Sequence, residues 1–289
     1  MKIFNTLCLE INARCNRKCE FCPVAYNVRP DERLDKNLID KAVKELAALK
    51  YKGRVEFYIY NEPLMDLEYL ETTIKQFRES TKACLMIATN GDYVRDPKTL
   101  LNLYELGVNQ ILVNCYSKGL YERRQSWQVF LAEHGVKIDK DVYSVKSSKS
   151  KIFWMMDKSN PDKFGQGIFR LVNRAGNIPE FIPEISQPVS RMCTKPFRLL
   201  NINWRGEALV CCQDYHGTVS FASLKTSTLV EIWNSPVMNE YRRRLLNKDR
   251  SLPLCNKCDC HAGAYPNNVD IPTGPFASKE SICQLATRN

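Results

Sequence analysis

The sequence predicts an α/β protein in which parallel strands form an open sheet or a barrel, followed by a small cysteine-rich domain. Short β-rich runs alternate with helical patterns from residue 4 to about residue 160, and this alternation then gives way to segments rich in proline, cysteine and glycine. Repeated strand–helix units of this length are typical of parallel strands joined by right-handed crossovers. A chain of 289 residues is long enough to bury the core of such a fold.

Five strands are predicted in the first part, and helices separate most of them. The strand-like runs cover residues 4–12, 54–60, 84–89, 110–116 and 151–156, and the helical patterns cover residues 38–49, 67–78, 97–106 and 120–133. Asp96-Pro97 and Gly107 have the chemistry expected at the two ends of a helix. In parallel barrels the reactive groups lie on loops at the carboxyl ends of the strands, so we expect the functional loops at that end.

The second part begins after residue 176, where four prolines in about twenty residues indicate an extended connector. Residues 197–204 and 207–212 flank Arg205-Gly206 and predict a hairpin with a tight turn, and residues 229–246 predict an amphipathic helix. The stretch from residue 254 has too little apolar pattern to form a core by itself. We expect its cysteines to hold it together through a metal.

The composition argues against nucleic-acid and membrane functions. The net charge of +10 allows an anionic partner such as RNA, but the basic residues are scattered and form no stripe interleaved with aromatic residues. A nucleic-acid partner is therefore the minor alternative. No apolar run approaches the roughly 20 residues that a membrane span needs, and the run over residues 3–11 is too short and polar for a secretory signal. We expect a cytoplasmic protein.

Thirteen cysteines are a high number for a cytosolic chain of this size, and most of them fall within residues 15–22, 193–212 and 255–260. A disulfide framework is typical of much smaller secreted chains with an even number of cysteines. Ligation of metal by thiolates explains the local grouping better than disulfides do. The cysteines are thus predicted to be metal ligands.

The first group is Cys15, Cys19 and Cys22, which follow the first predicted strand with the spacing CxxxCxxC. Four thiolates complete the ligation of a [4Fe–4S] cluster, whereas three leave one iron open to another ligand. This motif after a first strand resembles the radical S-adenosylmethionine (SAM) superfamily. The resemblance implies a partial, TIM-like (β/α)6 barrel and an open iron that binds SAM. It further implies cleavage of SAM to a 5′-deoxyadenosyl radical, which abstracts a hydrogen atom from the substrate.

Further residues match positions that contact SAM in that family. The second predicted strand ends in Glu62 and Pro63, as in the family's Gly-Gly-Glu-Pro-like motif, but Asn61 takes the place of the second glycine and the first is also missing. The resemblance implies that the cofactor contacts are Phe21, Asn61, Glu62, Asn90 and Asn114.

The second group combines cysteines on the predicted hairpin with cysteines near the end of the chain. It resembles the SPASM and Twitch extensions of radical SAM enzymes, which bind auxiliary iron–sulfur clusters. The one-cluster Twitch form fits better, and its implied ligands here are Cys193, Cys211, Cys255 and Cys258. Cys212 and Cys260 leave the choice of ligands open, and a zinc ribbon is the alternative to iron. The predicted regions are a barrel (residues 1–176), a connector (177–192), the auxiliary domain (193–262) and a tail (263–289).

The resemblance implies two related reactions on a small polar molecule such as an amino sugar or aminocyclitol. In the first, a nearby auxiliary [4Fe–4S] cluster accepts an electron and the substrate is oxidised. In the second, a thiol returns a hydrogen atom from the opposite face and the substrate is epimerised. Cys260 or Cys212 is the candidate hydrogen donor, and Arg174 is a candidate for substrate binding through its planar guanidinium. An electron donor such as flavodoxin or ferredoxin is expected.

Two other functions remain open. Many SPASM enzymes modify ribosomally made peptides, and those often carry a peptide-recognition domain ahead of the barrel. The first predicted strand begins at about residue 4, which leaves no room for such a domain and favours a small-molecule substrate. The alternative from a different class is a non-catalytic zinc-binding or RNA-binding module.

Overall fold

The computed structural model describes residues 3–139, 150–159 and 171–260. Within them one nine-stranded sheet has the order β5-β6-β4-β3-β2-β1-β7-β8-β9. The parallel strands are β1 (Thr6–Leu9), β2 (Arg54–Glu56), β3 (Cys84–Thr89), β4 (Gln110–Cys115), β6 (Ile152–Asp157), the short edge strand β5 (Lys137–Ile138) and β7 (Leu199–Ile202). The prediction of an α/β fold with mostly parallel strands is confirmed.

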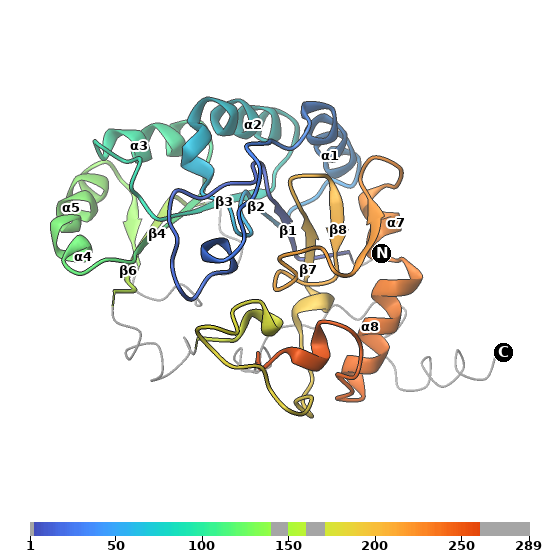
Figure 1. The fold of residues 1–289 in the computed structure, drawn as a ribbon. Helices are drawn as coiled ribbons and strands as arrows, with labels where there is room; N and C mark the ends of the chain where they lie inside the picture. The colour runs from blue at the N-terminus through green and yellow to red at the C-terminus, as the bar shows by residue number, and fades with distance from the viewer. Residues whose placement is uncertain (1–2, 140–149, 160–170, 261–289) are drawn as a thin grey trace.

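Helices cover one side of this sheet, as Figure 1 shows. They are α1 (Lys36–Ala48), α2 (Leu67–Ser80), α3 (Lys98–Glu105), α4 (Leu120–Arg123) and α5 (Gln125–Glu133). The helix predicted over residues 120–133 is broken at Arg124, which has the non-helical angles φ −97° and ψ 2°. Its side chain points inward, because it donates to the main-chain oxygen of Asn90 at 2.7 Å.

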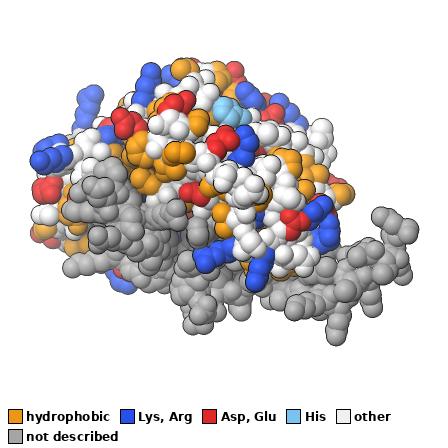
Figure 2. Space-filling view, turned by 60° about the horizontal axis from the view of Figure 1, so that its bottom comes forward, with side chains coloured by type: hydrophobic (Ala, Val, Ile, Leu, Met, Phe, Trp, Pro, Cys, Tyr) orange, Lys and Arg blue, Asp and Glu red, His pale blue; other side chains and the backbone are white. Residues whose placement is uncertain are grey.

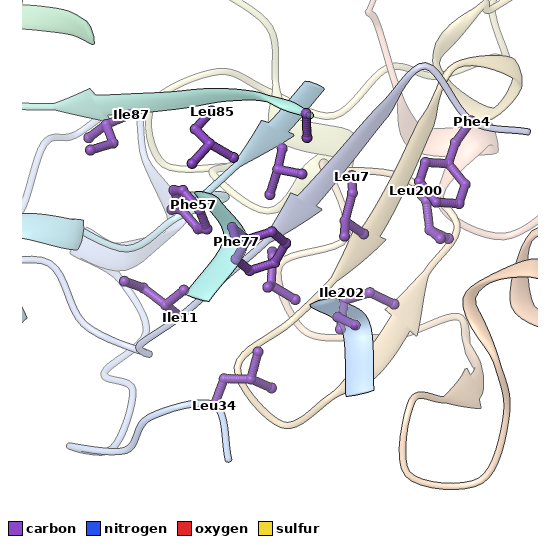
Figure 3. Packing of buried hydrophobic residues seen from close by; sticks show 14 of the residues in the cluster. Phe4, Leu7, Ile11, Leu34, Phe57, Phe77, Leu85, Ile87, Leu200 and Ile202 are labelled. Atoms are coloured by element: carbon purple, nitrogen blue, oxygen red, sulfur yellow. The ribbon is translucent and has the colours of Figure 1, made fainter. Parts of the chain in front are cut away.

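The core forms because successive residues of each strand point to opposite faces of the sheet. Leu7, Val55, Leu85 and Ile87 pack toward the helices with Phe77 of α2, and Figure 3 shows this cluster extending to Leu200 and Ile202 of β7. The opposite face of the sheet carries a second apolar cluster formed by Met86, Ala88, Leu112, Ile152 and Trp154. The strands lie between these two layers of side chains. The packing on both faces fixes the carboxyl ends of the strands, which carry the functional loops.

The C-terminal region continues the same sheet. β7 pairs in parallel with β1 and antiparallel with β8 (Glu207–Leu209), which in turn pairs with β9 (Ser220–Ser223). The predicted hairpin is therefore present, and Gly206 at its turn has a φ of +79°, where a Cβ would lie 2.5 Å from Leu38. The helix predicted over residues 229–246 is two helices, α7 (Leu229–Trp233) and α8 (Pro236–Leu246), because Ser235 caps a new helix before Pro236.

The surface and the helices bear on the expectations about a nucleic-acid partner and a membrane span. On the face shown in Figure 2, Lys and Arg side chains are interspersed with acidic and apolar ones over the visible elements. Of the helices in the described ranges, none combines the length and the apolarity needed to cross a bilayer. The predicted tail over residues 263–289 lies outside the described residues, and the predicted domain boundaries stay predictions.

Candidate active site and auxiliary metal site

The first cysteine group lies on the loop that connects β1 with a short 3₁₀ helix, η1 (Pro23–Ala25). Cys15, Cys19 and Cys22 are all half-buried there, and the N–H of Cys22 donates to the main-chain oxygen of Cys19 at 2.8 Å. Burial raises the pKa of both Cys15 and Cys19 to about 11. In the metal-free chain these groups are thus neutral thiols, and metal binding has to displace their protons.

Glu62 joins this loop to the strand ends beside it. Its carboxylate accepts hydrogen bonds from the hydroxyl of Thr89 at 2.6 Å, from the N–H of Asn90 at 2.7 Å and from the N–H of Leu64 at 3.0 Å. The side-chain amide of Asn90 donates to Asn16 at 2.7 Å and lies 3.9 Å from the sulfur of Cys15. Two residues predicted to contact SAM therefore lie together beside the cysteine loop.

A second set of contacts on this loop involves Asp92, a residue that no sequence motif singles out. Asp92 accepts two hydrogen bonds from Arg17, both at 2.6 Å, one from Asn16 at 2.9 Å and one from Arg124 at 3.2 Å. Arg17 lies between Cys15 and Cys19, so this ion pair fixes the loop to the segment after β3. The signal available in the sequence was the acidic residue that directly follows Asn90-Gly91.

The other residues predicted to contact SAM differ in whether protein groups already occupy their side chains. The side chain of Asn61 is occupied by its own turn, because its oxygen accepts from the N–H of Ile59 and its nitrogen donates to the main-chain oxygen of Phe57. The ring of Phe21 packs against Tyr116 with centroids 5.4 Å apart. The side-chain oxygen of Asn114 is buried without a partner. Such an unsatisfied buried acceptor is the kind of group that a polar cofactor would pair with, so Asn114 fits a contact with SAM.

The second cysteine group surrounds one small cavity in the C-terminal region. Its lining includes the four predicted ligands, Cys193, Cys211, Cys255 and Cys258, and also the predicted hydrogen donor Cys260. Cys212 is not part of the lining, and its sulfur accepts a hydrogen bond from Lys195 at 3.5 Å. A hydrogen bond with Cys211 and the charge of Lys195 lower the pKa of Cys212.

The donor set of this cavity fits an iron–sulfur cluster. None of the twelve cysteines in the described ranges forms a disulfide. Within those ranges no three His, Cys, Asp or Glu side chains converge closely enough to hold a single metal ion. A zinc ion needs all its ligands at about 2.0–2.3 Å from one point, whereas each thiolate of a [4Fe–4S] cluster binds a different iron. The five cysteines that line the cavity can supply the four thiolates that such a cluster requires.

Arg174 lies in the short 3₁₀ helix η3 (Arg174–Gly176), and its Nε donates to the main-chain oxygen of Phe21 at 3.4 Å. Burial lowers its pKa, but Tyr60, Cys22 and Cys212 oppose this effect and the pKa is raised overall. The hydroxyl of Tyr60 is buried and has no hydrogen-bond partner. Arg174 and Tyr60 therefore interact electrostatically with cysteines of both groups.

Comparisons with known proteins match both regions. The family model described as the radical SAM superfamily matches residues 9–117, and the model described as SPASM, an iron–sulfur cluster-binding domain, matches residues 193–259. The first match contains Cys15, Cys19 and Cys22. The second contains all four predicted ligands of the auxiliary site.

Individual relatives cover most of the chain. It is 25% identical over 275 residues to the S-adenosyl-L-methionine-dependent 2-deoxy-scyllo-inosamine dehydrogenase of Niallia circulans, covering 94% of this chain and 96% of that protein. The solved structure of BtrN in complex with AdoMet and 2-DOIA has a TM-score of 0.69 and 23% identity, covering 90% of this chain and 94% of that one. That of anSMEcpe with bound AdoMet and Cp18Cys peptide has a TM-score of 0.50 and 12% identity, covering 82% and 81%. The solved structures show a shared fold.

Proposed function

The chain is a radical SAM enzyme with a SPASM auxiliary iron–sulfur domain, and from this premise we propose that it oxidises a hydroxyl- or amine-bearing carbon of a small polar molecule. An aminocyclitol or an amino sugar is the proposed substrate class. The relative from Niallia circulans is a dehydrogenase by name and matches nearly the whole chain. This match supports oxidation and favours a small molecule over a peptide.

The bound groups supply the reactive species: the SAM-binding [4Fe–4S] cluster and SAM supply a 5′-deoxyadenosyl radical, and the auxiliary cluster supplies a one-electron acceptor. In the proposed oxidation the atoms and electrons balance as follows. The substrate carbon loses one hydrogen atom, its hydroxyl or amino group loses one proton, and one electron leaves the substrate. The product is a carbonyl compound or an imine.

The position of Arg174 carries this proposal. Its guanidinium contacts the cysteine loop through Phe21 and interacts electrostatically with Cys22 of the first group and Cys212 of the second. A substrate bound by Arg174 would therefore lie within reach of both metal sites. A guanidinium presents several N–H donors in one plane, which suits adjacent hydroxyl groups of a cyclic polyol.

Two further side chains support a polar substrate at this place. The unpartnered hydroxyl of Tyr60 can donate a hydrogen bond to it. Lys158 follows β6, and its ammonium lies 5.7 Å from the ring centroid of Tyr116. Burial and the charge of Arg174 lower the pKa of Lys158 to about 8, so this amine can take up the proton that the substrate loses.

Epimerisation is the second candidate, and the position of Cys212 favours it. Of the two proposed hydrogen donors, Cys260 lines the auxiliary cavity with the predicted ligands, whereas Cys212 lies outside that lining and interacts with Arg174. Hydrogen return requires a protonated thiol near the substrate that is not a cluster ligand. Cys212 is therefore the better candidate donor, although Cys260 stays a prediction as well.

The experiment is an anaerobic assay of the reconstituted enzyme with SAM, dithionite and 2-deoxy-scyllo-inosamine as the first substrate, followed by related aminocyclitols and amino sugars. Oxidation predicts one 5′-deoxyadenosine for each carbonyl product and a rate that rises between about pH 7 and 9 as Lys158 loses its proton. Lys158→Met should lose this rise. Product that keeps its oxidation state and gains deuterium from deuterated water would instead establish epimerisation, and turnover of peptides alone would refute both.

A further inference from the structure

We propose that Lys195 and Arg250 are charge partners of the auxiliary cluster and raise its reduction potential. A higher reduction potential would make the cluster a better electron acceptor, and this role rests on the proposed oxidation. The charge pairing itself does not depend on which substrate is oxidised. The evidence is the composition of the auxiliary cavity, whose lining contains five cysteines and these two cations but no Asp or Glu.

Lys195 is placed at the cavity by the turn that follows the first predicted ligand. It begins the 3₁₀ helix η4 (Lys195–Phe197), two residues after Cys193. Its ammonium donates a hydrogen bond to the sulfur of Cys212 at 3.5 Å. In the described ranges it makes no ion pair with a carboxylate. Its positive charge therefore lies next to cysteine sulfur rather than next to a carboxylate.

Arg250 is fixed at the cavity by main-chain oxygens. Its Nε donates to Arg191 at 2.9 Å, and one terminal nitrogen donates to the main-chain oxygens of Cys258 at 3.3 Å and Cys260 at 2.8 Å. The other terminal nitrogen is buried and has no partner. Arg250 is only 3% exposed. Among the described residues no carboxylate forms an ion pair with Arg250. A buried guanidinium in this position is costly unless another negative group compensates its charge.

Carboxylates that adjoin the lining residues in the sequence are occupied elsewhere, and Asp249, next to Arg250, forms an ion pair with Arg244 at 2.6 Å. Asp214 accepts hydrogen bonds from the N–H groups of Thr218 at 2.7 Å and Val219 at 2.8 Å. Asp259 accepts from the N–H of Asn173 at 2.8 Å. None of these carboxylates lines the cavity. The negative charge that balances Lys195 and Arg250 is therefore expected to come from a group held by the cysteines.

A thiolate-ligated iron–sulfur cluster is such a group. Four thiolates give the oxidised cluster a net negative charge, and reduction adds one more negative charge. Nearby cations stabilise the reduced form more than the oxidised form, because Coulomb energy scales with the charge of the cluster. Net charge and solvent exposure are among the factors that set the potentials of these clusters. Removing one cation should therefore lower the potential.

The test uses the triple variant Cys15→Ala/Cys19→Ala/Cys22→Ala, so that only the auxiliary cluster is present, with about four iron per chain. Its reduction is followed by electron paramagnetic resonance at a series of fixed potentials. Lys195→Met is expected to lower the ratio of reduced to oxidised cluster at least tenfold at a given potential, a shift of about 59 mV for one electron. Lys195→Gln is measured alongside, in case the methionine variant does not assemble a cluster.

Two variants act as controls for charge and for position. Lys195→Arg keeps the charge and should keep the potential. Lys225→Met removes the same charge from an exposed site in the same region and should leave the potential unchanged. An unchanged potential in cluster-loaded Lys195→Met or Lys195→Gln would overturn the inference. Failure to oxidise any substrate, with the potential shift intact, would count against the proposed function and leave the charge pairing standing.

Discussion

The carboxylate of Glu62 accepts a hydrogen bond from the main-chain N–H of Asn90 at 2.7 Å, which connects the segment after β2 to the segment after β3. Both residues were predicted from sequence to contact SAM, and Asn90 also reaches the sulfur of Cys15. Glu62 is almost fully buried, at 2% exposure. Its charge state therefore affects both the stability of the fold and the shape of the cofactor site.

The first prediction concerns the pH dependence of stability. Burial raises the pKa of Glu62 to about 7, although three hydrogen bonds oppose the shift, while an unfolded glutamate titrates near 4.3. The folded chain thus binds this proton more tightly, so the contribution of Glu62 to stability is fully present below about pH 4 and is lost as the pH rises through about 7. Glu62→Gln should flatten this part of the profile.

Urea unfolding of the metal-free chain between pH 5 and 8 measures this effect. The matched control is Glu68→Gln, which changes an exposed glutamate on α2 and should keep the slope of the parent. An identical pH profile for Glu62→Gln and the parent would show that Glu62 is ionised in the folded chain throughout this range.

The second prediction concerns Asp92. Asp92→Asn removes the ion pairs with Arg17 and Arg124 and leaves both guanidinium groups without their carboxylate. Because Arg17 lies inside the first cysteine motif, the loop should loosen and lose iron to a chelator several-fold faster. Asp31→Asn breaks an ion pair with Arg14 in which the two side chains are 70% and 42% exposed, and exposed pairs contribute about 0–1 kcal/mol. Equal rates of iron loss in the two variants would contradict the role of Asp92.

The sequence predicted β3 and β4 well because their apolar runs are buried on both faces. β3 has the predicted bounds, and all its residues are buried. The second strand was predicted over residues 54–60 but ends at Glu56. The segment after it turns, and the side chain of Asn61 makes hydrogen bonds with the main chain of that turn. The break at Arg124 could not be predicted, since its cause is a contact with Asn90, far away in the sequence.

The cysteine spacing predicted the members of both metal sites but not what surrounds them. The pairing of β7 with β1, which extends one sheet into the C-terminal region, depends on contacts between residues nearly 200 positions apart. Lys195 and Arg250 carry no motif, and only the fold brings them to one cavity. The same holds for Cys212, which follows Cys211 in the sequence but is not among the residues that line that cavity.

The third prediction separates the ligands from the other cysteines. The reconstituted parent should contain about eight iron per chain, as two [4Fe–4S] clusters require. Cys211→Ala should reduce this number to about four, whereas Cys212→Ala should leave it unchanged, because Cys212 does not line the cavity. A loss of about four iron in Cys212→Ala would assign that residue as a ligand and remove it as a hydrogen donor. Cys260→Ala is expected to keep its iron, since four other thiols line the cavity.

The fourth prediction concerns Arg174. Arg174→Lys keeps the charge but loses the planar donors, so kcat/KM for the substrate should fall by about ten- to a hundredfold, as expected for losing one hydrogen bond of about 1.5–3 kcal/mol that involves a charged group. Iron content should stay at the parent level. Arg123→Lys, on the exposed surface of α4, is the matched control. An unchanged kcat/KM in Arg174→Lys would exclude a planar contact with the substrate.

The central claim is that three thiolates of the loop after β1 leave one iron open for SAM. The most direct measurement is the release of 5′-deoxyadenosine from SAM and dithionite by the parent and by Cys19→Ala, both reconstituted under anaerobic conditions. The parent is predicted to release it, and Cys19→Ala is predicted to release none while keeping about four iron in the auxiliary site. Continued release by Cys19→Ala would contradict the assignment of the loop cysteines.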